Sequence, residues 1–239
     1  MFKTLIVKCL SDNYAYVCYN ENNEAFVVDP SEASPVIDCL EKNNLKLKYV
    51  LNTHHHFDHI GGNKELKKKY NSIVVGFKHD SERIPEIDIC LEDNEIWKSD
   101  NFVAKIIHVP GHTKGHICFH FYKDKLLFTG DTLFSLGCGR IFEGTYEQMF
   151  SSLNKIKAMP LDTQIYCGHE YTLNNSKFCI KHDPKNLNLK KKIQNIQKKL
   201  KNSLPTIPST LKEELDCNIF LRAKDVKTFS KLRDLKDNF

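Results

Sequence analysis

The stretch that most restricts what this chain can fold into is residues 53–59, which read Thr-His-His-His-Phe-Asp-His. In an extended segment side chains alternate between two sides, so His54 and His56 lie together and can bind one metal ion. Asp58 and His59 follow where we expect the chain to turn toward a helix, and they offer a carboxylate and an imidazole to a second ion. These donors suit hydrolytic zinc, and also manganese or iron. The array predicts a hydrolase with two metal ions.

The segments on either side of the array predict a strand, a turn and a helix. An apolar run, 49–51, precedes the array, and a glycine pair followed by the helix-forming residues 63–70 comes after it. Strand ends on a rigid scaffold often carry catalytic ligands. A histidine cluster can instead be a surface tract that binds metal weakly or a set of hydrogen-bonded core residues. We expect His55, which points away from the pair, to have such a structural role.

Three later segments each place a candidate ligand after an apolar strand, and this favours a metal site over the alternatives. They are residues 110–116 with His112, residues 128–132 with Asp131, and residues 166–170 with His169. Because one array cannot complete two metal shells, we expect further ligands from these segments. His116 opens an alternating strand, and a sheet-face position is favoured for it over metal binding.

Short apolar runs alternate with turns and helices over the first two-thirds of the chain, which indicates a layered α/β or α+β body. The predicted strands are residues 5–10, 14–19, 25–28, 49–52, 73–76, 103–108, 116–122, 126–129 and 164–167. Helical character is seen at residues 34–43 and 146–158. In the last third, helical spacing recurs around residues 189–200, prolines break the chain, and a closing helix is predicted near residues 226–232.

The four ligand segments, in this order, resemble the metallo-β-lactamase superfamily. The resemblance implies an α+β fold in which residues 1–170 form a four-layer αββα sandwich and residues 171–239 a helical, basic substrate-binding domain. It assigns the ligands by position: His54, His56 and His112 to the first metal, Asp58, His59 and His169 to the second, and Asp131 as a bridge. Asp29 matches a residue that supports the site by orienting its ligands.

Further motifs resemble one family within this superfamily, glyoxalase II or hydroxyacylglutathione hydrolase. They are residues 53–63, 130–134, 137–140, 167–172, 218–222 and 233–237. The resemblance implies that the glutathione arm of the substrate is bound by Arg140, Tyr171, Arg233 and Lys236. Arginine offers a fork to a carboxylate and lysine a point charge. Phe142 stands where the family often has tyrosine, so one hydroxyl contact is missing.

The implied reaction is hydrolysis of an S-2-hydroxyacylglutathione thioester, with S-D-lactoylglutathione giving D-lactate and glutathione as the second step of methylglyoxal detoxification. Hydroxide held by two divalent ions attacks the carbonyl, with zinc preferred and iron or manganese as alternatives. Asp58 orients the hydroxide and Asp131 bridges the ions, so both count as catalytic. The thiolate leaving group needs no separate acid.

Three alternatives come from other classes. A glutathione persulfide dioxygenase would use a single iron and oxygen. A nuclease would use the basic tail, yet no basic platform interleaved with aromatic residues is apparent. A binding protein without activity would be expected to have lost ligands, whereas all seven positions carry metal-binding side chains.

Composition limits the remaining choices. No apolar run approaches the roughly 20 residues that span a bilayer, and the N-terminus reads as a first strand rather than a signal peptide, so a cytoplasmic protein without membrane partners is expected. The nine cysteines have no CxxC spacing and predict reduced, buried thiols. Residues 171–239 carry 16 Lys and Arg against 7 Asp and Glu. We expect these mainly to be solvated helix faces, with a small-molecule partner, no nucleic acid, and a monomer rather than an oligomer.

Overall fold

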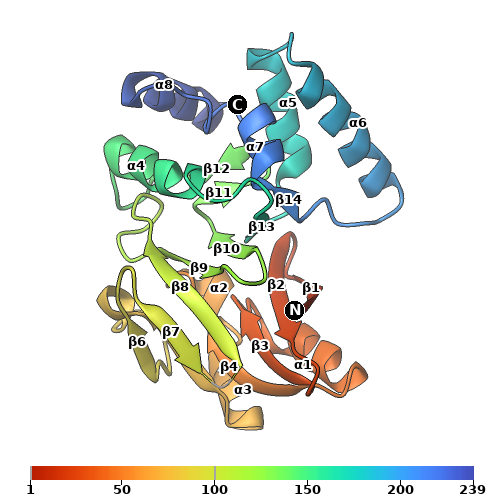
Figure 1. The fold of residues 1–239 in the computed structure, drawn as a ribbon, viewed down its shortest axis with the longest axis vertical. Coiled ribbons are helices and arrows are strands. Elements are labelled where there is room, and N and C mark those ends of the chain that lie inside the picture. Colours follow the sequence, from red (N-terminus) through yellow and green to blue (C-terminus); the bar gives the residue numbers. More distant parts are fainter. Residues whose placement is uncertain (1, 100) are drawn as a thin grey trace. The chain divides into compact units, whose positions relative to one another are not determined.

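The computed structural model describes residues 2–99 and 101–239, which form two compact units (Figure 1). Unit 1 comprises the described residues up to His108 together with 115–124, and unit 2 comprises 109–114 and 125–239. This division differs from the predicted boundary at residue 170, which stays a prediction. Within residues 2–99 and 101–239, no helix has the length and apolar character needed to cross a membrane.

A six-stranded mixed sheet forms the centre of unit 1. Its strands, in spatial order, are β1 (Lys3–Cys9), β2 (Asn13–Tyr19), β3 (Glu24–Val28), β4 (Lys46–Leu51), β5 (Ile73–Phe77) and β6 (Ile89–Leu91). The first three strands pair antiparallel, and β3 to β6 pair parallel. Because β3 and β4 run in the same direction, their carboxyl ends lie at one edge of the sheet, where Asp29 and the histidine array follow.

Alternation of side chains gives this sheet two buried faces. On one face, Val27 and Val50 pack with Leu40 of α1 (Ala33–Lys42) and Leu66 of α3 (Asn63–Tyr70). On the other face, the Phe26 ring stacks on Phe121, with ring centroids 4.6 Å apart. The side chains of both faces are fully buried, so burial of apolar area favours one register of the array that follows β4.

Three antiparallel strands complete unit 1. They are β7 (Ile96–Ser99), β8 (Phe102–His108) and β9 (Ile117–Phe121), paired in that order. Two short helical segments, α2 (Phe57–Ile60) and the 3-10 turn η1 (Lys78–Asp80), follow β4 and β5.

Unit 2 combines a small sheet with helices. Strand β10 (Leu126–Gly130) pairs parallel with β13 (Gln164–Cys167), which pairs antiparallel with β14 (Ser209–Thr210), and β11 (Leu133–Phe134) forms a hairpin with β12 (Gly137–Cys138). The helices are α4 (Tyr146–Lys157), α5 (Thr172–His182), α6 (Leu187–Lys201), α7 (Leu211–Cys217) and α8 (Val226–Asp237). Helix α4 begins with a capping box, in which Thr145 and Gln148 satisfy each other's backbone N–H groups.

A buried carboxylate ties the helices of unit 2 together. Glu214 of α7 is fully buried and accepts hydrogen bonds from Lys192 of α6, the Leu136 backbone N–H and Asn218. An unpaired buried charge would cost several kcal/mol, so these three donors are what allow a carboxylate here.

Every strand predicted from the sequence is present, with ends moved by up to about three residues, as are both predicted helices of the first two-thirds. The first strand begins at Lys3, and Met1 lies outside the described residues. Helices α6 and α8 account for the apolar spacing of the tail. The missed elements, among them β6, β7, β11, β12, β14, α5 and α7, are short or lack apolar periodicity.

The cysteines give a first testable prediction. All nine are free thiols, and only Cys90 is exposed. Burial raises the pKa of Cys18, Cys167 and Cys179 to about 12 each, which suppresses their reactive thiolate forms. Brief treatment of the native protein with N-ethylmaleimide at pH 7.5 should therefore add one label by intact mass, at Cys90, and denaturation should expose all nine. Rapid addition of several labels, or undiminished labelling of Cys90→Ser, would contradict this.

Candidate metal centre

The histidine array lies where strand β4 ends. The chain stays extended to His56, whose φ and ψ are −60° and 141°, and then enters helix α2. His54 and His56 point the same way, as expected for alternating residues, and His54 Nε2 lies 3.1 Å from His56 Nδ1. Two nitrogens bound to one tetrahedral zinc ion at 2.0–2.1 Å are roughly 3.3 Å apart. The pair therefore has the spacing that one ion requires.

Asp29 fixes the start of the array and one of its ligands. The residue follows β3, is 2% exposed and has a φ of +50°. Its Oδ1 accepts a hydrogen bond from the Thr53 backbone N–H at 2.8 Å, and its Oδ2 accepts one from Thr53 Oγ1 at 2.7 Å. Oδ2 also lies 3.1 Å from Nδ1 of His59. A carboxylate that accepts the Nδ1 proton leaves Nε2 as the donor atom for a metal, which agrees with the predicted supporting role of Asp29.

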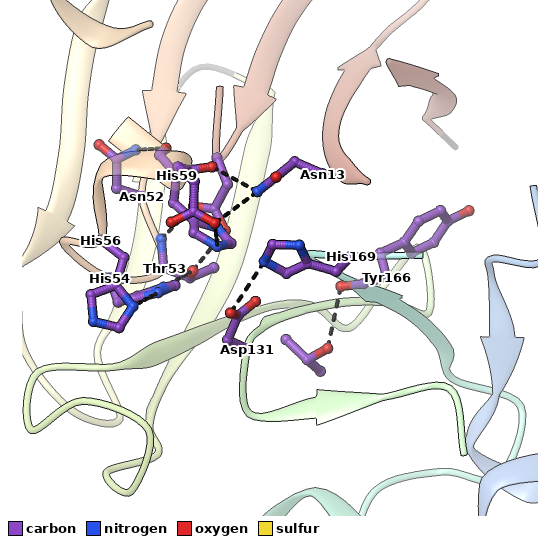
Figure 2. Close-up of polar contacts among 12 residues, drawn as sticks. Asn13, Asn52, Thr53, His54, His56, His59, Asp131, Tyr166 and His169 are labelled. Atoms are coloured by element: carbon purple, nitrogen blue, oxygen red, sulfur yellow. Dashed lines mark hydrogen bonds and ion pairs between the residues drawn. The ribbon is translucent and has the colours of Figure 1, made fainter. Parts of the chain in front are cut away.

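Asp58 and His59 occupy the first turn of α2, as the sequence predicted. Asn13 of β2 donates to the Asp58 backbone oxygen and to its Oδ2, both at 3.0 Å. The same Oδ2 lies 3.7 Å from Nε2 of His59. Asn52 donates to the His59 backbone oxygen at 3.1 Å (Figure 2). The contacts of Asn13 and Asn52 were not foreseen, because no motif marks an asparagine that braces a distant ligand.

Two further histidines of unit 1, His55 and His116, have contacts next to the array. His55 bonds to Asp80 and Arg83, which agrees with the structural role expected for it. His116 is buried just before β9, and its ring stacks on His54 with centroids 4.5 Å apart. Stacking restricts the orientation of the His54 ring.

In unit 2, Asp131 and His169 follow neighbouring parallel strands. Asp131 comes directly after β10, and His169 comes two residues after β13. The Gly168 N–H donates to the Gly130 oxygen at 2.9 Å, which joins the two strand ends. Asp131 Oδ2 lies 3.3 Å from His169 Nε2 (Figure 2). Both side chains are buried.

His112 reaches the same carboxylate from a loop. Its Nε2 lies 3.5 Å from Asp131 Oδ2. Its Nδ1 is 2.8 Å from the Arg140 carbonyl oxygen. Because a carbonyl only accepts, Nδ1 must carry the proton, which leaves Nε2 as the ligand atom. Asp131 Oδ2 thus lies between two imidazole nitrogens.

Gly139 makes this close packing possible. A Cβ atom at this position would lie 1.9 Å from the Asp131 backbone oxygen and 3.2 Å from Nδ1 of His112. Any side chain here would displace one of the two residues. The sequence around this glycine suggested a family resemblance but gave no sign of this contact.

The residues predicted to bind glutathione also lie in unit 2. Arg140 is largely exposed, and its Nε lies 3.4 Å from Asp237 Oδ1. Arg233 is 3% exposed and donates to the Cys138 backbone oxygen at 2.7 Å and to Asp237 Oδ1 at 2.9 Å. Burial and the charges of Arg233 and Arg140 lower the pKa of Lys236. Two guanidinium groups therefore share the Asp237 carboxylate, while the Lys236 ammonium lies over the rings of Phe178 and Phe239.

Tyr171 and Phe142 lie beside two of the histidines of unit 2. The Tyr171 ring stacks on His169 with centroids 4.6 Å apart. Phe142 is 63% exposed, and its ring lies 5.2 Å from that of His112.

Phe142→Tyr is a prediction that follows from this position. The added hydroxyl meets solvent, so the fold is unaffected, and it restores the group the family often has. A neutral hydrogen bond contributes about 0.5–1.5 kcal/mol, so KM for the glutathione thioester that the resemblance implies as substrate should fall about 2–10-fold with kcat unchanged. Steady-state kinetics measure this, and Tyr122→Phe, a change at another exposed aromatic residue, serves as control. An unchanged KM would show that no such contact forms.

The donor chemistry fits divalent metal ions. The candidate ligands in unit 1 are His54, His56, Asp58 and His59, and those in unit 2 are His112, Asp131 and His169. Ligand atoms of Asp29, His54 and His59 lie within 4.8 Å of one another. Imidazole with carboxylate, without cysteine, is the ligand set of hydrolytic rather than structural zinc sites. Hydrogen bonds to backbone and carboxylate groups orient the imidazoles, as metal sites require.

Two family models together match residues 9–239. The family model described as the metallo-beta-lactamase superfamily matches residues 9–169, and the one described as the hydroxyacylglutathione hydrolase C-terminus matches residues 170–239. The fold predicted from the sequence is therefore confirmed: an α+β metallo-β-lactamase fold with a C-terminal helical domain. The crystal structure of ETHE1 from Myxococcus xanthus covers 98% of this chain and 90% of its own, with a TM-score of 0.72 and 22% identity, a likeness of fold alone.

Curated relatives are similar over their full lengths. A hydroxyacylglutathione hydrolase of Pelagibacter ubique (strain HTCC1062) is 65% identical over 235 residues, 98% of each chain. Another, of Methylococcus capsulatus, is 41% identical over 254 residues, covering 100% of this chain and 99% of the relative. These matches far exceed what shared fold alone produces, and the chain belongs to the hydroxyacylglutathione hydrolase family of the metallo-β-lactamase superfamily.

Proposed function

We propose that this chain hydrolyses S-2-hydroxyacylglutathione thioesters, with S-D-lactoylglutathione as substrate and D-lactate and glutathione as products. The observation that carries the proposal is the 65% identity, over 98% of both chains, with a relative named hydroxyacylglutathione hydrolase. This reaction is the second step of methylglyoxal detoxification.

The cations of unit 2 suit the glutathione arm. Glutathione has two carboxylates and one ammonium group, so it is an anion that a group of cations can hold. Arg140 presents an exposed guanidinium, and Lys236 an ammonium whose lowered pKa reflects burial and its cationic neighbours. Arg233 is more deeply buried and supports this group through Asp237. Tyr171 adds an exposed aromatic face.

The metal ligands complete the proposal. His54, His56 and His112 would hold the first ion, Asp58, His59 and His169 would hold the second, and Asp131 would serve as a ligand to both. Zinc is the proposed metal, with iron and manganese accepted by the same donors. Two such ions supply an activated water at neutral pH and polarise the thioester carbonyl.

The protein's own side chains set the remaining conditions. Asp29 and the Arg140 carbonyl hold His59 and His112 with Nε2 available for metal binding. Asn13 holds the Asp58 carboxylate, which orients the attacking water. A thiol has a pKa near 8.5, so the glutathione thiolate departs without a general acid. No serine or cysteine nucleophile is needed.

Hydrolysis and metal content test the function together. Protein stripped by a chelator should not hydrolyse S-D-lactoylglutathione, and addition of two equivalents of Zn²⁺ should restore turnover. Full activity of the stripped protein would overturn the metal mechanism. The alternative, a persulfide dioxygenase with one iron, is not favoured, because the C-terminal segment matches the hydrolase family. Oxygen consumption with glutathione persulfide, in the absence of thioester hydrolysis, would reverse this choice.

We also propose a cytoplasmic monomer. Nine free thiols suit a reducing compartment, since disulfides form readily in oxidising ones. Light scattering of the purified chain tests the monomer, and a dimer mass would contradict it.

A further inference from the structure

His55 stands between two proposed metal ligands, and both of its ring nitrogens are engaged. Its Nδ1 lies 3.0 Å from Asp80 Oδ2, and its Nε2 lies 3.2 Å from Arg83 Nη1. The ring therefore closes a three-residue network on the side of the array opposite His54 and His56.

These partners favour a single tautomer of His55. A guanidinium only donates hydrogen bonds, so Nε2 must accept from Arg83 and carry no proton. A carboxylate accepts, so the proton lies on Nδ1 and is donated to Asp80. The two contacts thus favour one tautomer and one ring orientation for His55.

Asp80 is the buried centre of the network. It is 0% exposed, and its Oδ1 accepts from Arg83 Nε at 3.1 Å and from Arg83 Nη2. The carboxylate lies against Gly115, where a Cβ atom would come within 2.2 Å of Oδ1. Three segments therefore meet at one carboxylate: the array, the turn after β5, and the residue before His116. His116 in turn stacks on His54.

We propose that Asp80, Arg83 and Gly115 act through His55 as positioning residues. They hold the backbone between His54 and His56 in the conformation in which both imidazoles can bind one ion. The inference rests on the proposed function in that it takes these two histidines as ligands. Two ligands separated by one residue depend on the torsions of that residue. Asp80 at the centre of the network is fully buried and is bonded to both His55 and Arg83, so it favours one arrangement of the three side chains and restricts the backbone of His55.

Asp80→Asn and Arg83→Gln test the proposal. The amide that replaces the Asp80 carboxylate has one acceptor oxygen instead of two. Its N–H₂ group must therefore face the donor of either His55 or Arg83, and one of these two hydrogen bonds is lost. Zn²⁺ affinity, measured by competition with a chromophoric chelator, should fall roughly 10–100-fold in each variant. The kcat for S-D-lactoylglutathione should fall similarly while KM changes less than about threefold. Effects in the double variant should be less than additive, because both residues act through His55.

Lys78→Gln is the matched control. Lys78 lies in the turn that contains Asp80, is exposed and pairs with Glu92. Its replacement by glutamine removes one positive charge, as Arg83→Gln does, without changing a residue of the network. Zn²⁺ affinity and kcat should match those of the parent protein. A second readout is the ¹⁵N shifts of the His55 ring, which should show protonated Nδ1 in the parent protein and a changed tautomer in Asp80→Asn.

Two outcomes would overturn the positioning role. The first is that Asp80→Asn and Arg83→Gln have the same Zn²⁺ affinity and kcat as Lys78→Gln. The other is a loss of activity matched by the loss of folded protein in thermal unfolding, with unchanged affinity per folded molecule. A parent protein that binds Zn²⁺ but does not cleave the thioester would defeat the proposed function alone, because the affinity comparison does not use the substrate.

Discussion

Replacing Asp131 by alanine is expected to lower kcat for S-D-lactoylglutathione roughly 10³-fold and to reduce bound zinc from two ions to one or none. The Asp131 carboxylate is buried between His112 and His169, with its Oδ2 3.5 Å and 3.3 Å from their Nε2 atoms. If it bridges two ions, its loss removes a ligand from both. The ions then also lose the negative charge that the carboxylate supplied, and the neutral imidazoles of His112 and His169 cannot replace that charge. Metal analysis after gel filtration, together with steady-state kinetics, measures both effects.

Asp162→Ala is the control for this experiment. Asp162 belongs to the same unit, is exposed, and forms a surface ion pair with Lys125. Its removal should leave metal content and kcat unchanged. Retention of two zinc ions by Asp131→Ala would exclude the bridge, whatever happens to the rate.

The fold was predictable where burial produces a run or a regular spacing of apolar residues in the sequence. Strands β2 and β3 are buried on both faces, and β10 begins with the apolar run 126–128, so each was evident. Hairpin β11–β12 has two residues in each strand and no room for a period. Helix α5 is rich in Thr, Asn and Ser, which are poor helix formers, and its position is decided by packing of Phe178 and Cys179.

The candidate metal ligands could be named from the sequence because metal binding restricts residue type. Four segments each bring imidazole or carboxylate groups to the end of an apolar run, and catalytic residues concentrate in the loops that follow such runs. Their supports were not predictable. Asn13, Asp80 and Arg83 are ordinary residue types whose roles depend on contacts 25 to 45 residues away along the chain.

Arg233 shows where the sequence misleads about accessibility. The basic tail reads as solvated helix faces with a few cations available to a substrate. The structure instead buries Arg233 at 3% exposure against the Cys138 backbone oxygen and the Phe220 ring. Cys138 is 95 residues away from Arg233 along the chain, so neither the charge pattern nor the spacing of the tail could reveal this contact.

That burial makes Lys236 the better test of substrate binding. Lys236→Met should raise KM for S-D-lactoylglutathione about 10–100-fold with kcat within about threefold, because a charge-assisted hydrogen bond contributes about 1.5–3 kcal/mol. Lys231→Met removes the same charge from an exposed position of α8 and should leave KM unchanged. A loss of kcat with KM intact in Lys236→Met would show that the lysine does not anchor glutathione.

Arg233→Met should raise KM by a similar factor and also lower the free energy of unfolding. The guanidinium contributes to both, since it supports Arg140 through Asp237 and satisfies the buried Cys138 oxygen. An oxygen left unsatisfied costs about 1–3 kcal/mol, which urea unfolding resolves. Arg233→Lys keeps the charge but cannot reach both partners as a fork, so it should recover less than half of the lost binding energy. If the lysine variant recovered all of it, charge alone would suffice and the paired contacts of Arg233 would be irrelevant to the substrate.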